Sequence, residues 1–103
     1  MAADSSSRKL TRADVDARLE GAPGWRFEND GLHRELTFAS FPDAIAFVAR
    51  LAFDAEKADH HPEILVNYKR VRVTWSTHSA GGVTDKDFAG VEQSDTIAKR
   101  FGV

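Results

Sequence analysis

One amphipathic stretch in the middle of the chain most restricts how it can fold. Ser40 and Asp43 have the spacing of an N-terminal capping pair, and Pro42 falls in the first turn, where its missing N–H costs little. Apolar residues then follow the spacing of one helix face, namely Ala44, Phe47, Val48, Leu51, Ala52 and Ala55. Since Pro62 disfavours helix at the residue before it, the pattern predicts a helix of about five turns that ends near Asp59.

A β-hairpin is predicted on each side of this helix. In the first, Trp25–Glu28 alternates apolar and polar residues, Asn29–Gly31 provides turn residues that tolerate positive φ, and Leu32–Phe38 continues as a second strand. In the second, the short run Ile64–Tyr68 precedes the longer alternating run Arg70–Thr77. Strands joined by such short turns pair antiparallel, so the four runs predict one antiparallel sheet.

Two further Thr-x-x-Asp capping boxes predict a helix near each end of the chain, opened by Thr11 and by Thr84. The resulting order, α-β-β-α-β-β-α, is typical of an α+β fold. We predict a single domain at residues 10–103, in which about three helices pack on one face of a four-stranded antiparallel sheet. Residues 1–9 are polar and Ser-rich, which predicts a mobile N-terminal tail.

Composition narrows the chemistry that this domain can perform. The chain has no cysteine, which excludes disulfides, thiolate nucleophiles and cysteine-ligated metal sites. Its net charge of -2 argues against direct binding of nucleic acid, which needs a surplus of Lys and Arg. No apolar run approaches the roughly 20 residues of a membrane span, and residues 1–9 lack the apolar segment of a secretory signal. We therefore expect a cytoplasmic protein, away from membranes, that works with histidines, carboxylates and hydroxyls.

Three of the four histidines fall in one region of the predicted fold. His60 and His61 end the central helix, and His78 ends the long strand, which the second hairpin folds back toward them. Glu56 lies one turn before His60, so we expect this carboxylate to orient the imidazole. The remaining histidine, His33, has no acid–base neighbour in the sequence and is predicted to be an exposed strand residue.

Three interpretations of the histidine cluster compete. His60 and His61 could simply complement the helix dipole, with His78 exposed at a strand end. Three imidazoles are also a common zinc ligand set, but no pair here has the i, i+4 spacing of a helical metal motif. Acid–base catalysis without a cofactor fits three groups that titrate near neutral pH better than metal binding does.

The segments that carry these histidines resemble one enzyme family. They read Glu56-Lys57-x-Asp59-His60-His61-Pro62, then Tyr68, Ser76-Thr77-His78 and Thr84-x-x-Asp87. This pattern is similar to that of the pterin-4a-carbinolamine dehydratases, also called 4a-hydroxytetrahydrobiopterin dehydratases. The resemblance covers the chain from about Trp25 to the C-terminus and agrees with the predicted α+β layout.

The resemblance implies a catalytic set and a set of substrate contacts. The catalytic residues would be His60, His61 and His78, supported by Asp87, although Asp87 is equally the third helical residue of the Thr84 capping box. The substrate-binding residues would be Asp59, His60, His61, Ser76, Thr77, His78 and Ser79. Ser79 stands where animal members carry Glu. Trp75 stands where members usually carry a smaller aliphatic residue, and we expect it to affect packing because it faces away from His78.

The family removes water from the 4a-hydroxytetrahydropterin that aromatic amino acid hydroxylases produce, which gives quinonoid dihydropterin. The pterin is the substrate, and neither a metal nor a cofactor is implied. We expect His60 and His78 to flank the reacting C4a–N5 edge as the acid–base pair. His61 would orient the pterin, and Glu56 would hold the tautomer of His60.

A non-enzymatic role remains as the alternative. Some animal relatives act as a transcription cofactor, and some bacterial relatives assist carboxylase assembly, generally with a degraded histidine motif. The intact Asp59-His60-His61-Pro62 and Ser76-Thr77-His78 motifs favour the enzyme. A short four-stranded sheet leaves unpaired edges, so we also expect a homodimer or homotetramer, as in the family.

Overall fold

The computed structural model describes residues 8–103 and contains the predicted order of elements. The helices are α1 (Arg12–Leu19), α2 (Phe41–Ala58) and α3 (Asp85–Arg100), with a short 3-10 helix η2 (His78–Ala80) before α3. The strands are β1 (Arg26–Glu28), β2 (Gly31–Thr37), β3 (Glu63–Asn67) and β4 (Arg70–Trp75). The α+β prediction is therefore confirmed. Of the predicted mobile tail at residues 1–9, residues 1–7 lie outside the described part of the chain.

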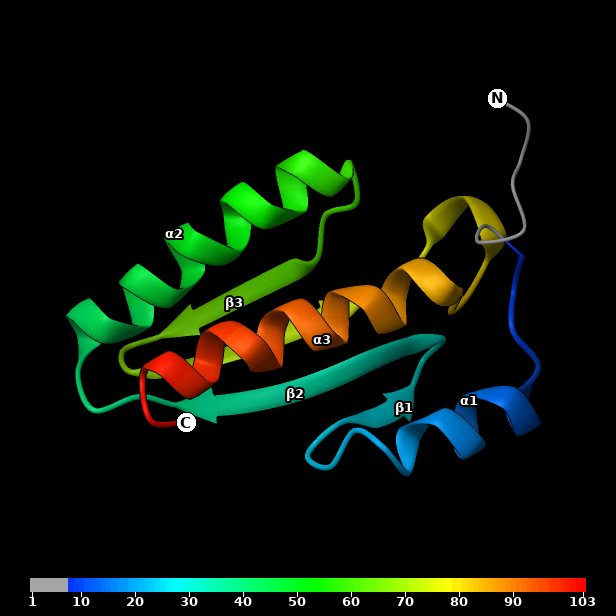
Figure 1. Cartoon of the computed structure of the whole chain (residues 1–103), viewed down its shortest axis with the longest axis horizontal. Coiled ribbons are helices and arrows are strands. Elements are labelled where there is room, and N and C mark those ends of the chain that lie inside the picture. Colours follow the sequence, from blue (N-terminus) through cyan, green and yellow to red (C-terminus); the bar gives the residue numbers. More distant parts are fainter. Residues whose placement is uncertain (1–7) are drawn as a thin grey trace.

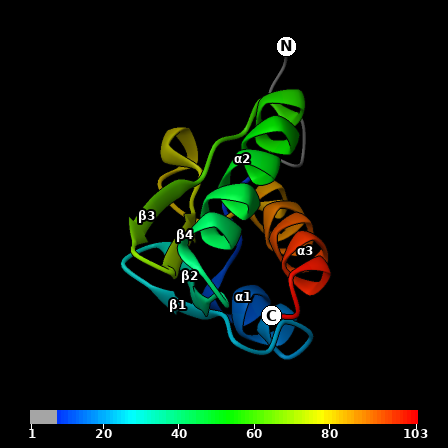
Figure 2. The ribbon, with the colours of Figure 1, turned by 90° about the vertical axis from the view of Figure 1, so that its left-hand side faces the viewer.

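The four strands form one antiparallel sheet in the order β1-β2-β4-β3. The two hairpins are joined through β2 and β4, where Leu32 pairs with Trp75 and Leu36 with Val71. All three helices lie on the same side of this sheet (Figures 1 and 2), with α2 and α3 side by side across it and α1 near β1. Among residues 8–103, no helix is both long and apolar enough to cross a bilayer.

The core lies between the sheet and α2 and α3. Along β4, Val71, Val73 and Trp75 are buried, whereas Arg72 and Thr74 alternate onto the uncovered face. The predicted apolar face of α2 buries Ala44, Phe47, Leu51 and Ala55. Val48 is partly buried, and Ala52 is exposed because, at 100° per residue, it lies at the edge of this stripe.

Local signals place the starts of the three helices and the end of α2 where the sequence predicted them. The capping boxes of Thr11 and Thr84 each make both reciprocal hydrogen bonds, and the Ser40 hydroxyl accepts from the N–H of Asp43. Helix α2 ends because Asp59 adopts the left-handed conformation, with φ 55° and ψ 39°. Strand β4 ends at Trp75, earlier than predicted, because Thr77 leaves β2 and forms an isolated bridge with Gly82 instead.

Candidate active site

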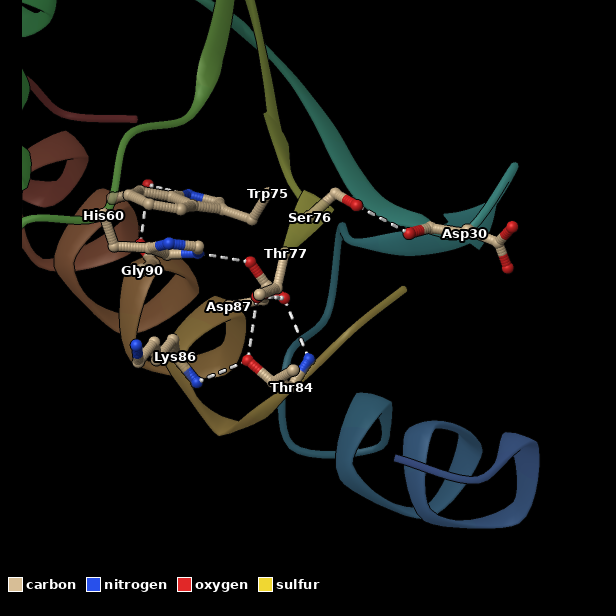
Figure 3. Close-up of polar contacts among 10 residues, drawn as sticks. Asp30, His60, Trp75, Ser76, Thr77, Thr84, Lys86, Asp87 and Gly90 are labelled. Carbon is tan, nitrogen blue, oxygen red and sulfur yellow. Dashed lines mark hydrogen bonds and ion pairs between the residues drawn. The ribbon is translucent and has the colours of Figure 1, made fainter. Parts of the chain in front are cut away.

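The turn after α2 directs His60 toward α3. The left-handed conformation of Asp59 takes the next residue off the helix, and the N–H of His60 then donates to the carbonyl of Ala55 at 3.1 Å. The imidazole Nε2 lies 2.6 Å from Oδ1 of Asp87, a residue of the first turn of α3 (Figure 3). Two residues 27 positions apart are thereby joined at the meeting point of the two helices.

Asp87 is fully buried, and both of its carboxylate oxygens are used. Oδ1 faces His60, and Oδ2 accepts from the N–H of Thr84 at 2.8 Å and from the hydroxyl of Thr77 at 2.7 Å. Asp87 therefore completes the capping box and also contacts the imidazole of His60. Among the described residues, no buried side-chain polar atom lacks a hydrogen-bond partner.

The hydroxyl groups around Asp87 have a defined direction of donation. A carboxylate only accepts, so the single proton of the Thr77 hydroxyl is used toward Asp87. The hydroxyl of Thr84, 2.8 Å from that of Thr77, must then donate to Thr77 and accept from the N–H of Lys86 (Figure 3). This ordered chain holds the Asp87 carboxylate in one orientation.

The same reasoning assigns the tautomer of His60. Because Oδ1 of Asp87 can only accept, Nε2 carries a proton, and on the neutral ring Nδ1 holds the lone pair. Among the described residues, Nδ1 has no hydrogen-bond partner, while 15% of the side chain is exposed. The atom of His60 that can exchange a proton with a bound molecule is therefore Nδ1.

Trp75 covers one face of the His60 ring. The two rings stack with centroids 5.5 Å apart and an interplanar angle of 26° (Figure 3). The indole is 1% exposed, and its N–H donates to the Ser94 hydroxyl at 3.0 Å. Trp75 is packed as the sequence predicted, but it also touches a predicted catalytic residue. Strand alternation places the Trp75 side chain on the helix-facing side of the sheet, where His60 lies just after the end of α2.

Glycine at position 90 of α3 provides the space for this indole. A Cβ atom at Gly90 would overlap the ring carbons of Trp75. We therefore expect Gly90→Ala to lower the free energy of unfolding by about 1–3 kcal/mol, through overpacking. Denaturant unfolding checks this, with Gly21→Ala as the matched control, because a Cβ there meets its nearest neighbour at 3.7 Å. Equal stability of the two variants would show that Trp75 moves aside freely.

The prediction that Glu56 orients His60 is wrong. The Glu56 carboxylate contacts Nε2 of His61 instead, at 2.8 Å, and both side chains are exposed. The physical reason is the left-handed turn at Asp59, which ends the helical spacing that the prediction assumed. Asp87 makes the contact with His60 that was expected of Glu56, and Glu56 contacts His61.

The remaining predicted residues lie in the segment after β4, apart from Asp59, which lies in the turn after α2. His78 is exposed and opens η2, directly after the Thr77 that hydrogen-bonds to Asp87. Ser76 donates its hydroxyl to the carbonyl of Asp30 at 2.9 Å, which joins this segment to the β1–β2 turn (Figure 3). Ser79 and Asp59 are exposed. Within residues 8–103, no hydrogen bond or ring stacking joins His78 to His60 or His61. The same residues contain no group of three His, Cys, Asp or Glu side chains that could hold a metal ion.

His33 differs from its prediction as an exposed residue. It is partly buried, with Nε2–H donating to the carbonyl of Glu28 at 2.7 Å and Nδ1 accepting from the Thr74 hydroxyl at 2.9 Å. Thr74 alternates with Trp75, so His33 lies on the uncovered face of the sheet, opposite the site.

The structure is an α+β domain that holds the imidazole of His60 against the buried carboxylate of Asp87. A family model described as pterin 4 alpha carbinolamine dehydratase matches residues 8–97. A "Putative pterin-4-alpha-carbinolamine dehydratase" of Chloroflexus aurantiacus is 46% identical over 89 residues, which cover 86% of this chain and 96% of the relative. A protein of the same description from Mycobacteroides abscessus is 48% identical over 87 residues, which cover 84% of this chain and 93% of the relative.

Solved structures share the fold. A transcriptional coactivator/pterin dehydratase from Brucella melitensis superposes with a TM-score of 0.86 and 36% identity, covering 88% of this chain and 99% of that one. A pterin dehydratase-like protein described as a RuBisCO assembly factor in the alpha-carboxysome has a TM-score of 0.60 at 21% identity, covering 72% of this chain and 86% of that one. At this identity the likeness shows the fold alone. The chain belongs to the pterin 4 alpha carbinolamine dehydratase family.

Proposed function

We propose that this protein dehydrates a 4a-hydroxytetrahydropterin to the quinonoid dihydropterin by histidine acid–base catalysis. The observation that carries the proposal is the buried Asp87, which fixes His60 and leaves its Nδ1 free. The pterin would be the substrate, with no metal or cofactor, and an aromatic amino acid hydroxylase would supply it. The reaction would then support recycling of tetrahydrobiopterin.

The chemistry requires two proton movements. The bond between C4a and the hydroxyl oxygen breaks, the leaving hydroxyl takes up one proton to become water, and one proton leaves a ring nitrogen of the pterin. No electrons are gained or lost overall. Each well-positioned imidazole typically contributes about 10²–10⁴-fold to such a step.

His60 is suited to one of these steps because its partner is fixed. Nδ1 can take up or release a proton, while Nε2–H remains bonded to Asp87. When Nδ1 is protonated, the buried carboxylate balances the positive charge at short range. We assign the second proton movement to His78, which lies one residue from Thr77 and is open to solvent.

The other predicted residues receive binding roles in this proposal. His61, paired with Glu56 at the surface, orients the pterin or its hydroxyl. Asp59, Ser76 and Ser79 provide polar contacts with the substrate. Thr77, whose hydroxyl is committed to Asp87, contributes by holding the His78 segment in place.

A second candidate function, binding of a protein partner, is favoured by apolar side chains on the outer surface of α2. Phe41, Ile45 and Phe53 are 46%, 43% and 75% exposed, and spacings of four and eight residues bring them to one side of the helix. Within residues 8–103, strand β3 pairs with β4 alone, which supports association of two or four copies. Because these residues differ from the histidine site, the two functions can be tested separately.

The test of the enzyme is dehydration of freshly generated 4a-hydroxytetrahydropterin, followed by ultraviolet absorbance. The wild-type protein is expected to accelerate the reaction by at least about 10²-fold over buffer. His33→Ala, which alters a histidine on the opposite face of the sheet, is expected to keep the rate within about threefold of wild type. No acceleration by folded wild-type protein would reject the enzymatic proposal and favour partner binding.

A further inference from the structure

Trp75 and α3 together limit where the His60 ring can lie. One face of the imidazole is stacked on the indole, and the edge at Nε2 is bonded to Asp87. A single hydrogen bond leaves a ring free to turn about the line between its two atoms. A flat aromatic surface against one face removes that freedom, because only one ring plane then remains in contact.

The indole is itself held rigidly. Its N–H donates to Ser94, and the Ser94 hydroxyl donates in turn to the carbonyl of Gly90 at 2.8 Å. Gly90 lies flush against the ring, with no room for a Cβ atom. A glycine inside a helix is unfavourable relative to alanine, so its presence here is explained by the space that Trp75 occupies. Trp75, Gly90 and Ser94 therefore act as one rigid support behind His60.

We propose that Trp75 is a positioning residue for the reaction of His60. The stack keeps Nε2–H on Asp87 and keeps Nδ1 turned toward the substrate, while the covered face excludes water from that side. Trp75 is 1% exposed, so it acts through His60 and does not touch the pterin. This inference deepens the proposed dehydratase function and rests on it for the kinetic effect.

The first measurement is nitrogen-15 NMR of the His60 ring, which needs no substrate. Wild type and Trp75→Phe are expected to show one neutral tautomer, protonated at Nε2, with ring protons shifted upfield by the stacked aromatic ring. Trp75→Leu is expected to lose the upfield shift and to populate both tautomers. A single unchanged tautomer in Trp75→Leu would overturn the inference, even if wild type proved inactive as a dehydratase.

The second measurement is the steady-state kinetics of the folded variants. Trp75→Leu is expected to lower kcat by about 10- to 100-fold, because a small misplacement of a catalytic group has effects of this size. KM should change by less than about threefold, and Trp75→Phe should retain most of the rate. A kcat within about threefold of wild type in Trp75→Leu would overturn the inference.

Two controls separate positioning from general packing. Phe38→Leu opens a cavity among the aromatic rings of Phe38, Phe47 and Phe101, near the Arg70 end of β4, and should destabilise the protein while leaving kcat unchanged. In the Trp75→Leu background, Gly90→Ala adds a methyl group where the indole had been and removes a helical glycine. It should restore stability without restoring kcat. Recovery of kcat together with stability would show that Trp75 only fills space.

Discussion

His60→Ala is expected to lower the dehydration rate of the folded protein by about 10²–10⁴-fold. The substitution removes the one imidazole whose tautomer is fixed by a buried carboxylate, and Nδ1 is lost with it. The effect should fall on kcat rather than KM, because the imidazole acts on the moving proton in the transition state and not on the bound substrate before it. The rate is measured by ultraviolet absorbance on freshly generated 4a-hydroxytetrahydropterin.

The control for this prediction is a second histidine substitution in the same assay. His61→Ala removes an exposed ring that pairs with Glu56 at the surface, and is expected to raise KM more than it lowers kcat. If His60→Ala keeps its rate within a few-fold of wild type while His61→Ala loses it, the catalytic assignment moves to His61. His78→Ala, measured beside them, is expected to lose kcat as His60→Ala does.

Asp87→Ala is expected to lower both stability and activity, because Asp87 joins the helix cap to the imidazole. The substitution leaves three donors without their acceptor: the Thr84 N–H, the Thr77 hydroxyl and Nε2–H of His60. Each unsatisfied buried group costs about 1–3 kcal/mol, so we expect a loss of about 3 kcal/mol or more in the free energy of unfolding. Denaturant unfolding followed by circular dichroism measures it.

Asp87→Asn separates the structural role of the carboxylate from its chemical role. The amide oxygen can still accept from Thr84 and Thr77, which preserves most of the cap. The amide nitrogen then faces Nε2 of His60 and donates to it, which moves the ring proton to Nδ1. We expect a variant that is nearly as stable as wild type but has a kcat lowered by about 10²-fold or more. Wild-type kcat in Asp87→Asn would show that the tautomer of His60 does not matter.

The local part of the fold could be predicted from the sequence. Capping residues, turn residues and apolar periodicity act over a few neighbouring positions, so Ser40, Thr11 and Thr84 mark helix starts without any knowledge of the fold. The helix-facing side of β4 followed from strand alternation for the same reason. The roles of the individual motif residues remain predictions.

Prediction from the sequence failed where the backbone conformation of a single residue changes the direction of the chain. Extending the helix of Glu56 by one turn places His60 beside it, but the left-handed Asp59 intervenes and the carboxylate meets His61. Strand Arg70–Thr77 was predicted too long because the backbone of Thr77 leaves the sheet and pairs with Gly82 instead, its N–H donating to the Gly82 carbonyl at 2.9 Å. Thr84 was predicted as a helix cap, but its hydrogen bond to the hydroxyl of Thr77 was not, because Thr77 lies outside the local capping pattern.

The sequence by itself determined the elements of this protein, their order and the residues that face the core, because each depends on neighbours within a few positions. The tertiary structure alone decided which carboxylate meets which imidazole, and that Trp75 stacks on His60 with Gly90 behind it. Those contacts join residues from the turn after α2, from β4 and from α3. They depend on the direction in which the chain leaves one turn, and no local pattern encodes the meeting of three separate elements.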